Sequence, residues 1–170
     1  MIAGMPRAGP PSAELRLRAA APTDRVRVLV WNGDRAVRAR SLDPRPIDLA
    51  SHARWFAVRL ADPLTRMWII EIERQPLGLV RIQRAVADGP GRISIVVDPI
   101  ARHRGLGRRA IRSACQLDGG PIVAEILADN HVSVACFERA GFEDAGGTLD
   151  APLGTPAAGV RRFVWRYSHA

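Results

Sequence analysis

The residues best suited to chemistry lie in one short segment, residues 98–109, with the sequence DPIARHRGLGRR. Arginines and the glycines Gly105 and Gly107 stand there between an apolar, β-branched run and a helical pattern. Glycine lets the backbone approach a ligand closely, and the unpaired amides at a helix start attract negative charge. Arginine adds charge-assisted hydrogen bonds to phosphate. The segment therefore predicts a cradle for a polyphosphate.

Other phosphate-binding patterns do not fit this segment. It lacks the Gly-Lys-Ser/Thr of a P-loop, and its glycines do not have the Gly-x-Gly-x-x-Gly spacing of dinucleotide-binding turns. The pattern that remains is Arg-x-x-Gly-x-Gly, which begins at Arg102. A second block, NHVSVACFERAGF over residues 130–142, follows after one predicted helix and one predicted strand.

Together these two blocks resemble those of the GNAT superfamily of acetyltransferases. That family carries the first pattern in its CoA pyrophosphate loop and an Asn-x-x-Ser/Ala…Tyr-Glu-x-x-Gly-Phe block at the second. The resemblance implies a mixed α/β fold whose mostly antiparallel central sheet is splayed between strands 4 and 5 and flanked by helices. It also implies acetyl-CoA as co-substrate, no metal, and direct attack of an amine on the thioester without an acyl-enzyme. The residues implied to contact CoA are Val96, Val97, Arg102, Arg104, Gly105, Leu106, Gly107, Arg108, Asn130, Ser133 and Phe137.

The catalytic groups are less defined. Phe137 stands where many family members have a tyrosine that protonates the leaving thiolate, and phenylalanine has no proton to give. Ser133 or Tyr167 could replace it, and Glu125 or His52 could take the proton of the attacking ammonium group. Each has an ordinary alternative: Glu125 a paired carboxylate, His52 a packed residue. Asn130 could likewise be a plain helix N-cap.

The N-terminal half of the sequence bears on the identity of the acetyl acceptor. Trp31-Asn32-Gly-Asp, followed by His52-x-x-Trp55-Phe, resembles a subset of the superfamily that includes pseudaminic-acid-pathway acetyltransferases, which acetylate an amino group of a UDP-linked amino sugar. The resemblance implies that Trp31, Asn32, His52, Trp55 and Arg81 bind the acceptor. The tryptophans suit stacking on a sugar or a base, and Arg81 a phosphate. Both tryptophans could instead be core residues.

Two alternatives to a nucleotide sugar remain open. One acceptor class is protein N-termini or small amines, as in ribosomal-protein-acetylating relatives, although a basic surface suits a basic target poorly. The other reading is a non-catalytic acyl-CoA-binding domain, which the phenylalanine at position 137 favours and the intact glycine loop disfavours.

These residues need a scaffold, which hydrophobic periodicity outlines. A helix from about residue 24 breaks at 31–34, where Trp-Asn-Gly-Asp interrupts the pattern. The predicted strands cover residues 14–20, 67–73, 77–86, 92–98, 121–127 and 160–167, with the first hairpin connected at 74–76. The other predicted helices cover residues 48–61, 105–117 and 130–140. Helices, a strand meander and then alternating strands and helices predict a mixed α/β sheet.

Composition sets the outer limits. The 170 residues fit one domain, predicted over 14–170 behind a flexible tail at 1–13. All 25 lysine-plus-arginine positions are arginine, and the net charge is +8. The arginines are spread along the chain, so no nucleic-acid partner is expected, and no apolar run is long enough for a membrane span. Two cysteines without metal-type spacing favour a reducing cytoplasm. A homodimer is compatible with the sequence.

Overall fold

The computed structural model describes residues 14–146 and 156–165. The predicted tail over residues 1–13 and Tyr167 lie outside these ranges, so neither expectation is tested. No helix in the described ranges combines the length and the apolar composition that a bilayer crossing requires.

In the described residues, seven strands form one sheet in the order β1-β2-β3-β4-β5-β7-β6. The strands are β1 (Leu15–Ala19), β2 (Thr65–Ile72), β3 (Gln75–Gln83), β4 (Gly91–Val97), β5 (Ile122–Leu127), β6 (Phe142–Asp144) and β7 (Val160–Trp165). All neighbouring strands run antiparallel except β4 and β5, which run parallel. The mixed, mostly antiparallel sheet expected from the sequence is confirmed.

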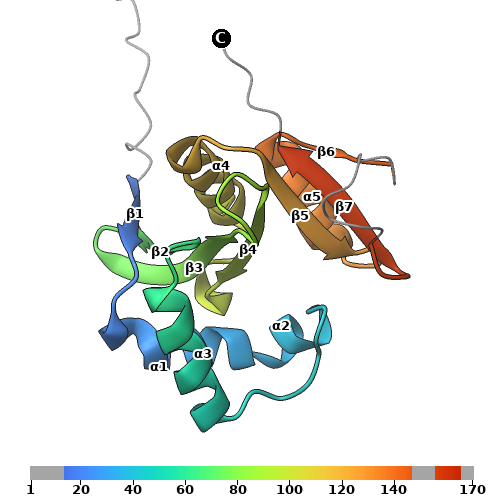
Figure 1. Ribbon diagram of the computed structural model, residues 1–170. Coiled ribbons are helices and arrows are strands. Elements are labelled where there is room, and N and C mark those ends of the chain that lie inside the picture. The colour runs from blue at the N-terminus through green and yellow to red at the C-terminus, as the bar shows by residue number, and fades with distance from the viewer. Residues whose placement is uncertain (1–13, 147–155, 166–170) are drawn as a thin grey trace, which may run out of the picture.

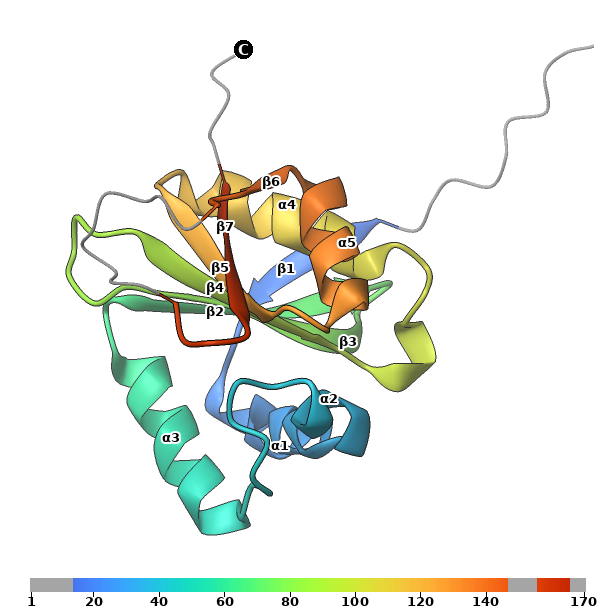
Figure 2. The same ribbon diagram turned by 90° about the vertical axis from the view of Figure 1, so that its right-hand side faces the viewer.

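Helices cover both faces of this sheet (Figures 1 and 2). They are α1 (Arg25–Gly33), α2 (Arg35–Ala39), α3 (Leu49–Ala61), α4 (Leu106–Asp118) and α5 (His131–Ala140), with short 3-10 turns η1 (Pro22–Asp24) and η2 (Pro99–Ala101). Helices α1, α2 and α3 lie on one side, and α4 and α5 on the other (Figure 2). The predicted break of the first helix is confirmed, because Asp34 separates α1 from α2 and its carboxylate caps α2 by accepting from the Val37 amide.

Successive side chains of the central strands point to opposite faces of the sheet, so each face has its own hydrophobic core. Ile70 and Val80 point to the α4 and α5 side, while their neighbours Ile69 and Leu79 point to the α1 and α3 side. A strand covered by helices on both faces needs apolar residues at successive positions, which is how β2 and β3 read in the sequence. The central strands are therefore buried on both faces, and a ligand can reach them only where two neighbouring strands separate.

That gap lies between β4 and β5. Their ladder contains only two register pairs, Gly91 with Ile122 and Arg92 with Val123, after which the strands diverge. The divergence is visible in Figure 1, where β5, β7 and β6 turn away from β4. The splay between the fourth and fifth strands that the family resemblance implied is thus present.

The largest differences from the sequence prediction are the bounds of β3 and the presence of β6. The first hairpin turns at Glu73 and Arg74, whose φ values of 50° and 65° are positive, so β3 begins at Gln75 and ends at Gln83 rather than running over 77–86. Pro76 lies inside the strand because it falls beside a register shift at Ile70/Glu71, where a missing amide proton is tolerated. The short strand β6 was not predicted; three residues are too few to show a period.

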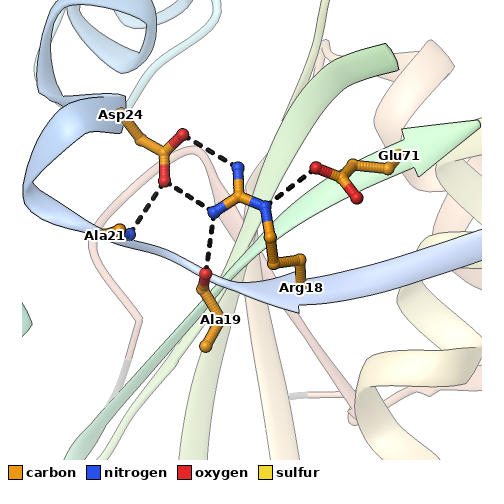
Figure 3. A network of polar contacts seen from close by, with 5 residues as sticks. All are labelled: Arg18, Ala19, Ala21, Asp24 and Glu71. Carbon is orange, nitrogen blue, oxygen red and sulfur yellow. Dashed lines mark hydrogen bonds and ion pairs between the residues drawn. The ribbon is translucent and has the colours of Figure 1, made fainter. Parts of the chain in front are cut away.

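An ion-pair network fixes the start of α1 (Figure 3). The guanidinium of Arg18 on β1 donates to both oxygens of Asp24, at 2.9 Å each, and to Glu71 on β2, at 2.8 Å. Burial alone would raise the pKa of Asp24, but hydrogen bonds from Arg18 and the Ala21 amide hold it below its ordinary value. One side chain therefore joins the edge of the sheet to the helices on one face.

Candidate functional site

The predicted polyphosphate cradle is the connection from β4 to α4. After β4 the chain makes the η2 turn, where Asp98 accepts from the Ile100 amide at 3.0 Å and from the Trp31 indole Nε1 at 2.8 Å. Gly105 then caps α4 with φ of 71°, in the left-handed region that favours glycine. Leu106 is buried in the core and anchors the helix start. No side-chain oxygen of the described residues caps the start of α4, and this arrangement is compatible with an anion at its first amides.

The arginines of this connection divide into two kinds. Arg104 and Arg108 are exposed and make no hydrogen bond or ion pair with any residue that the structure describes. Arg102, in contrast, donates to the Val97 carbonyl at 3.0 Å and to the Asp34 carboxylate at 3.1 Å. The hydrogen bond from Arg102 is the main reason why the pKa of Asp34 lies below its ordinary value. Arg102 thus joins the connection to α2, whereas Arg104 and Arg108 keep their charge available.

Gly107 lies against the neighbouring elements. A Cβ there would stand 3.3 Å from the Cys136 Sγ on α5 and 3.8 Å from a Val97 methyl. Burial raises the pKa of Cys136, so its thiol is not activated in this position. The absence of a side chain at position 107 therefore allows α4, α5 and the end of β4 to come together.

A cleft of about 760 Å³ opens at the splay. Its walls come from the end of α1, from α2 and the segment that follows it, from α3, from β3, β4 and β5, and from α5. Nine residues predicted from the sequence to form the site line it: Asn32, His52, Trp55, Arg81, Val96, Glu125, Asn130, Ser133 and Phe137. Val97 and residues 102–108 lie beyond this lining, in the connection described above, and Trp31 lies elsewhere.

The structure contradicts the expectation that Trp31 binds the acceptor. Its side chain is 3% exposed and belongs to the core beneath α1 and α3. The indole also uses its only donor on Asp98. No face of this ring is available for stacking on a sugar or a base. Trp31 instead packs in the core and holds Asp98 through its indole hydrogen bond.

Helix α5 brings the second sequence block to the cleft. The Asn130 carboxamide caps the helix by accepting from the Ser133 amide at 3.3 Å, which confirms its predicted N-cap role. Its Nδ2 also donates to the Arg40 carbonyl at 3.5 Å, across the cleft. Phe137 is 4% exposed and packs edge-on against Phe142, with ring centroids 5.1 Å apart. The phenylalanine therefore forms a rigid apolar wall where a tyrosine would offer a proton.

Glu125 on β5 is held by two guanidinium groups. Its Oε1 accepts from Arg162 on β7 at 2.7 Å, and its Oε2 lies 3.2 Å from Arg92 on β4. Both oxygens are thus engaged, and the Arg92 contact crosses from β4 to β5 beside the last register pair. This arrangement makes Glu125 a bridge between strands and a weak candidate for a general base.

His52 is the other predicted candidate for a general base, and both of its ring nitrogens are buried. It is 2% exposed, lines the cleft, and neither ring nitrogen has a hydrogen-bond partner among the described residues. Burial, reinforced by the charge of Arg25, holds its pKa below the ordinary value of 6.5. The imidazole is therefore neutral at pH 7 and can accept a hydrogen bond or a proton.

Arg81 and Trp55 form a stacked pair in the same cleft. The guanidinium carbon of Arg81 lies over the Trp55 ring, 5.3 Å from its centroid. Burial, followed by the charges of Arg59 and Arg92, lowers the pKa of Arg81 to about 10. The group remains protonated at pH 7 and places a fixed positive charge in the wall of the cleft.

Sequence reasoning missed several residues that shape this site. Asp34 and Asp98 hold the connection from β4 to α4, while Arg92 and Arg162 hold Glu125. Asp34 carried a signal, because an aspartate after a helix break is a typical N-cap. The arginine partners of Glu125 carried none, since their proximity depends on strand register.

Comparison with known proteins agrees with this geometry. Residues 14–143 match the acetyltransferase (GNAT) domain family. Spermidine N-acetyltransferase from Vibrio cholerae, solved in complex with CoA and spermine, is 19% identical with a TM-score of 0.73, covering 88% of this chain and 94% of that one. Aminoglycoside acetyltransferase AAC(6')-Ib, in complex with coenzyme A and kanamycin, is 20% identical with a TM-score of 0.69, covering 89% and 94%.

A curated relative matches over a shorter stretch. An uncharacterized protein of Mycobacterium leprae is 35% identical over 74 residues, which are 43% of this chain and 20% of that protein. The matched stretch thus spans about a fifth of the length of that relative. The structural matches, at 19–20% identity, are evidence of the fold.

Proposed function

This chain belongs to the acetyltransferase (GNAT) family. From this premise we propose that it is an acetyl-CoA-dependent N-acetyltransferase and that it acetylates the amino group of a nucleotide-linked sugar. The observation that carries the choice of acceptor is the charge of the cleft. Its lining includes five arginines and three carboxylates: Arg38, Arg40, Arg45, Arg81 and Arg92 against Asp43, Asp48 and Glu125. A polycation such as spermine would be repelled there, whereas a diphosphate would be attracted.

The volume of the cleft supports the same acceptor. About 760 Å³ is within the usual range for sites that enclose a molecule of drug size, and Trp55 offers aromatic surface in its wall. His52, Trp55 and Asn32 line the cleft together, which supports an acceptor site there. Trp31 does not contribute, which leaves Trp55 as the one tryptophan of that motif beside the acceptor.

The chemistry that we assign to the cleft is direct transfer. The neutral amine attacks the thioester carbonyl carbon, a C–N bond forms, the C–S bond breaks, and the electron pair leaves with sulfur. The nitrogen then loses one further proton, and the thiolate takes up a proton to become the free thiol. His52 accepts the proton that the ammonium group must lose, either directly or through one water molecule. Strand β4 contributes the amide of Val97 toward the pantetheine arm and the oxyanion, because its edge facing β5 has no strand partner there. Amides alternate in direction along a strand, and those of Val96 and Asp98 face β3.

Protonation of the thiolate needs no tyrosine at position 137. A CoA thiolate is a tolerable leaving group, and the Ser133 hydroxyl lines the same cleft as Phe137.

Binding of the CoA diphosphate is assigned to Arg104, Arg108 and the first amides of α4. Arg102 is assigned the contact with Asp34 at the start of α2.

A small-amine acceptor is the second candidate, favoured by the structural similarity to the spermidine and aminoglycoside enzymes. The deciding experiment incubates the purified protein with acetyl-CoA and, separately, a UDP-linked amino sugar, spermidine, kanamycin and an N-terminal peptide. Mass spectrometry of the products is the readout. We expect acetylation of the nucleotide sugar in preference to the polycations. Preference for spermidine or kanamycin would refute the nucleotide-sugar assignment, and tight acetyl-CoA binding without acetylation of any amine would indicate a non-catalytic domain.

Two further expectations belong with this proposal. A cytoplasmic location, where acetyl-CoA is available, and assembly as a homodimer both remain predictions. Size-exclusion chromatography with light scattering tests the second of these directly.

A further inference from the structure

Three arginines approach one another under α3. Arg81 on β3 is opposite Ser94 on β4, and Arg92 is opposite Gln83, so Arg81 and Arg92 are diagonal neighbours on one face of the sheet. Arg59 lies near the end of α3, and its charge acts on Arg81 together with that of Arg92. Like charges on neighbouring side chains repel one another, so the three arginines require negative partners.

Two of the three have such partners within the protein. Arg59 lies 3.5 Å from the Asp62 carboxylate, and Arg92 lies 3.2 Å from Glu125. Arg81 has neither a hydrogen bond nor an ion pair with any described residue, and its Nε is fully buried without an acceptor. Its positive charge rests only against the Trp55 ring. A partly buried guanidinium without an anion is costly, so its retention in the wall of a cleft indicates a bound ligand.

We propose that Arg81, held against Trp55 and flanked by Arg92, binds an acidic group of the acceptor, a phosphate or a carboxylate. This inference rests on the proposed function and narrows it to acceptors that carry both an amine and an acid. Trp55 restricts the guanidinium to one orientation, which leaves the planar donors free for a two-oxygen anion. Arg92 adds a second charge from the neighbouring strand.

The position of this subsite separates it from the cofactor cradle. Ser94, which pairs with Arg81, precedes Val97 by three residues, or about 10 Å along an extended strand. The cofactor connection begins after Val97, at the opposite end of β4. The proposed subsite thus lies between the middle and the start of β4, where Arg81 and Arg92 are, and the diphosphate is assigned to the connection after its end. The splayed region between them is left for the reacting amine and thioester.

The test measures binding and does not depend on turnover. The protein is first saturated with CoA, so that the cofactor cradle is filled, and is then titrated by calorimetry with UDP or with glutarate. The variants are Arg81→Gln, Arg81→Lys and Arg92→Gln. The matched control is Arg16→Gln, which removes an equal charge from an exposed position on β1 outside the cleft.

We expect wild type and Arg16→Gln to bind at least one of the two probes with equal affinity. Arg81→Gln should weaken that binding about tenfold or more, with a smaller loss for Arg81→Lys, because a charge-assisted hydrogen bond is removed. If Arg81→Gln fails to fold by circular dichroism, Arg92→Gln, altered at a more exposed side chain, must weaken binding instead. Loss of UDP binding alone identifies a phosphate as the source of the anion, and loss of glutarate binding alone a carboxylate.

Two results would overturn the subsite. One is wild-type affinity for both probes in Arg81→Gln, and the other is absence of binding of either probe to the CoA-loaded wild-type protein. Arg81-dependent anion binding without acetylation of a nucleotide sugar would retain the subsite and reject only the proposed function. Acetylation of that sugar with unchanged kcat/KM in Arg81→Gln would do the reverse.

Discussion

Gly105 and Gly119 provide a matched pair for testing the cofactor cradle. They flank the two ends of α4, with φ of 71° and 72°, and an added Cβ would meet nothing within 4 Å at either position. Alanine at either site therefore introduces the same backbone strain without a clash. We propose the single variants Gly105→Ala and Gly119→Ala, which differ only in that the first lies at the start of the helix and the second at its end.

The strain of a left-handed alanine is about 1 kcal/mol. For a domain of this size that corresponds to a decrease in Tm of about 2–4 °C, and we expect a similar decrease in both variants. Only Gly105→Ala changes the backbone that presents the first amides of α4. If one charge-assisted hydrogen bond to the diphosphate is lost, at about 1.5 kcal/mol or more, acetyl-CoA binding weakens by about tenfold or more.

Calorimetric titration with acetyl-CoA, beside thermal melts of both variants, measures the two effects separately. Gly119→Ala serves as the control for strain, since it should melt early and bind normally. Equal acetyl-CoA affinity in Gly105→Ala and Gly119→Ala, at equal loss of Tm, would show that the diphosphate does not bind at the start of α4. A loss of affinity in Gly119→Ala as large as that in Gly105→Ala would attribute the effect to strain in the helix.

Three further predictions address the catalytic cleft and the hairpin. Phe137→Tyr should leave kcat unchanged or raise it up to about tenfold, since it restores only a proton donor; a large loss of kcat at unchanged Tm would mean that the phenyl ring contacts substrate. Burial keeps the pKa of His52 below 6.5, so its contribution to stability is complete above pH 6.5 and is lost as the pH falls below it. Melts between about pH 7.5 and about pH 5 should therefore lose less stability in His52→Gln than in wild type, and parallel curves would contradict this. Replacing Glu73 and Arg74 with Asn and Gly, which suit their positive φ values, should raise Tm by about 2–4 °C without altering KM.

The parts of the fold visible in the sequence are those determined by local spacing. The glycine at position 105, the N-cap at Asn130 and the helix break before Asp34 each act within a few residues, and the structure has all three where the spacing predicted them. The β4–β5 splay came instead from the resemblance to a family, because periodicity does not show which strands part.

The parts that the sequence could not show depend on register between distant strands. Glu125 and Arg162 are directly opposite one another on β5 and β7, although 37 residues separate them in the chain. The same holds for Arg81 and Trp55, which meet because α3 packs against the sheet. Trp31 was misplaced for a related reason: an amphipathic ring suits both a core and a ligand, and only its neighbours decide which.

The divergence of β4 from β5 makes the sheet two half-sheets joined by a very short seam. Beyond Arg92 and Val123, the facing backbone edges of the two strands have no ladder partner in one another. A pantetheine arm placed between them would accept and donate hydrogen bonds in place of the missing strand partner. Cofactor binding would therefore stabilise the part of the sheet that has the fewest backbone hydrogen bonds between strands. Amide hydrogen exchange should then slow most along residues 93–97 and 124–127 when CoA is added, and the enzyme without CoA should open first at its own active site.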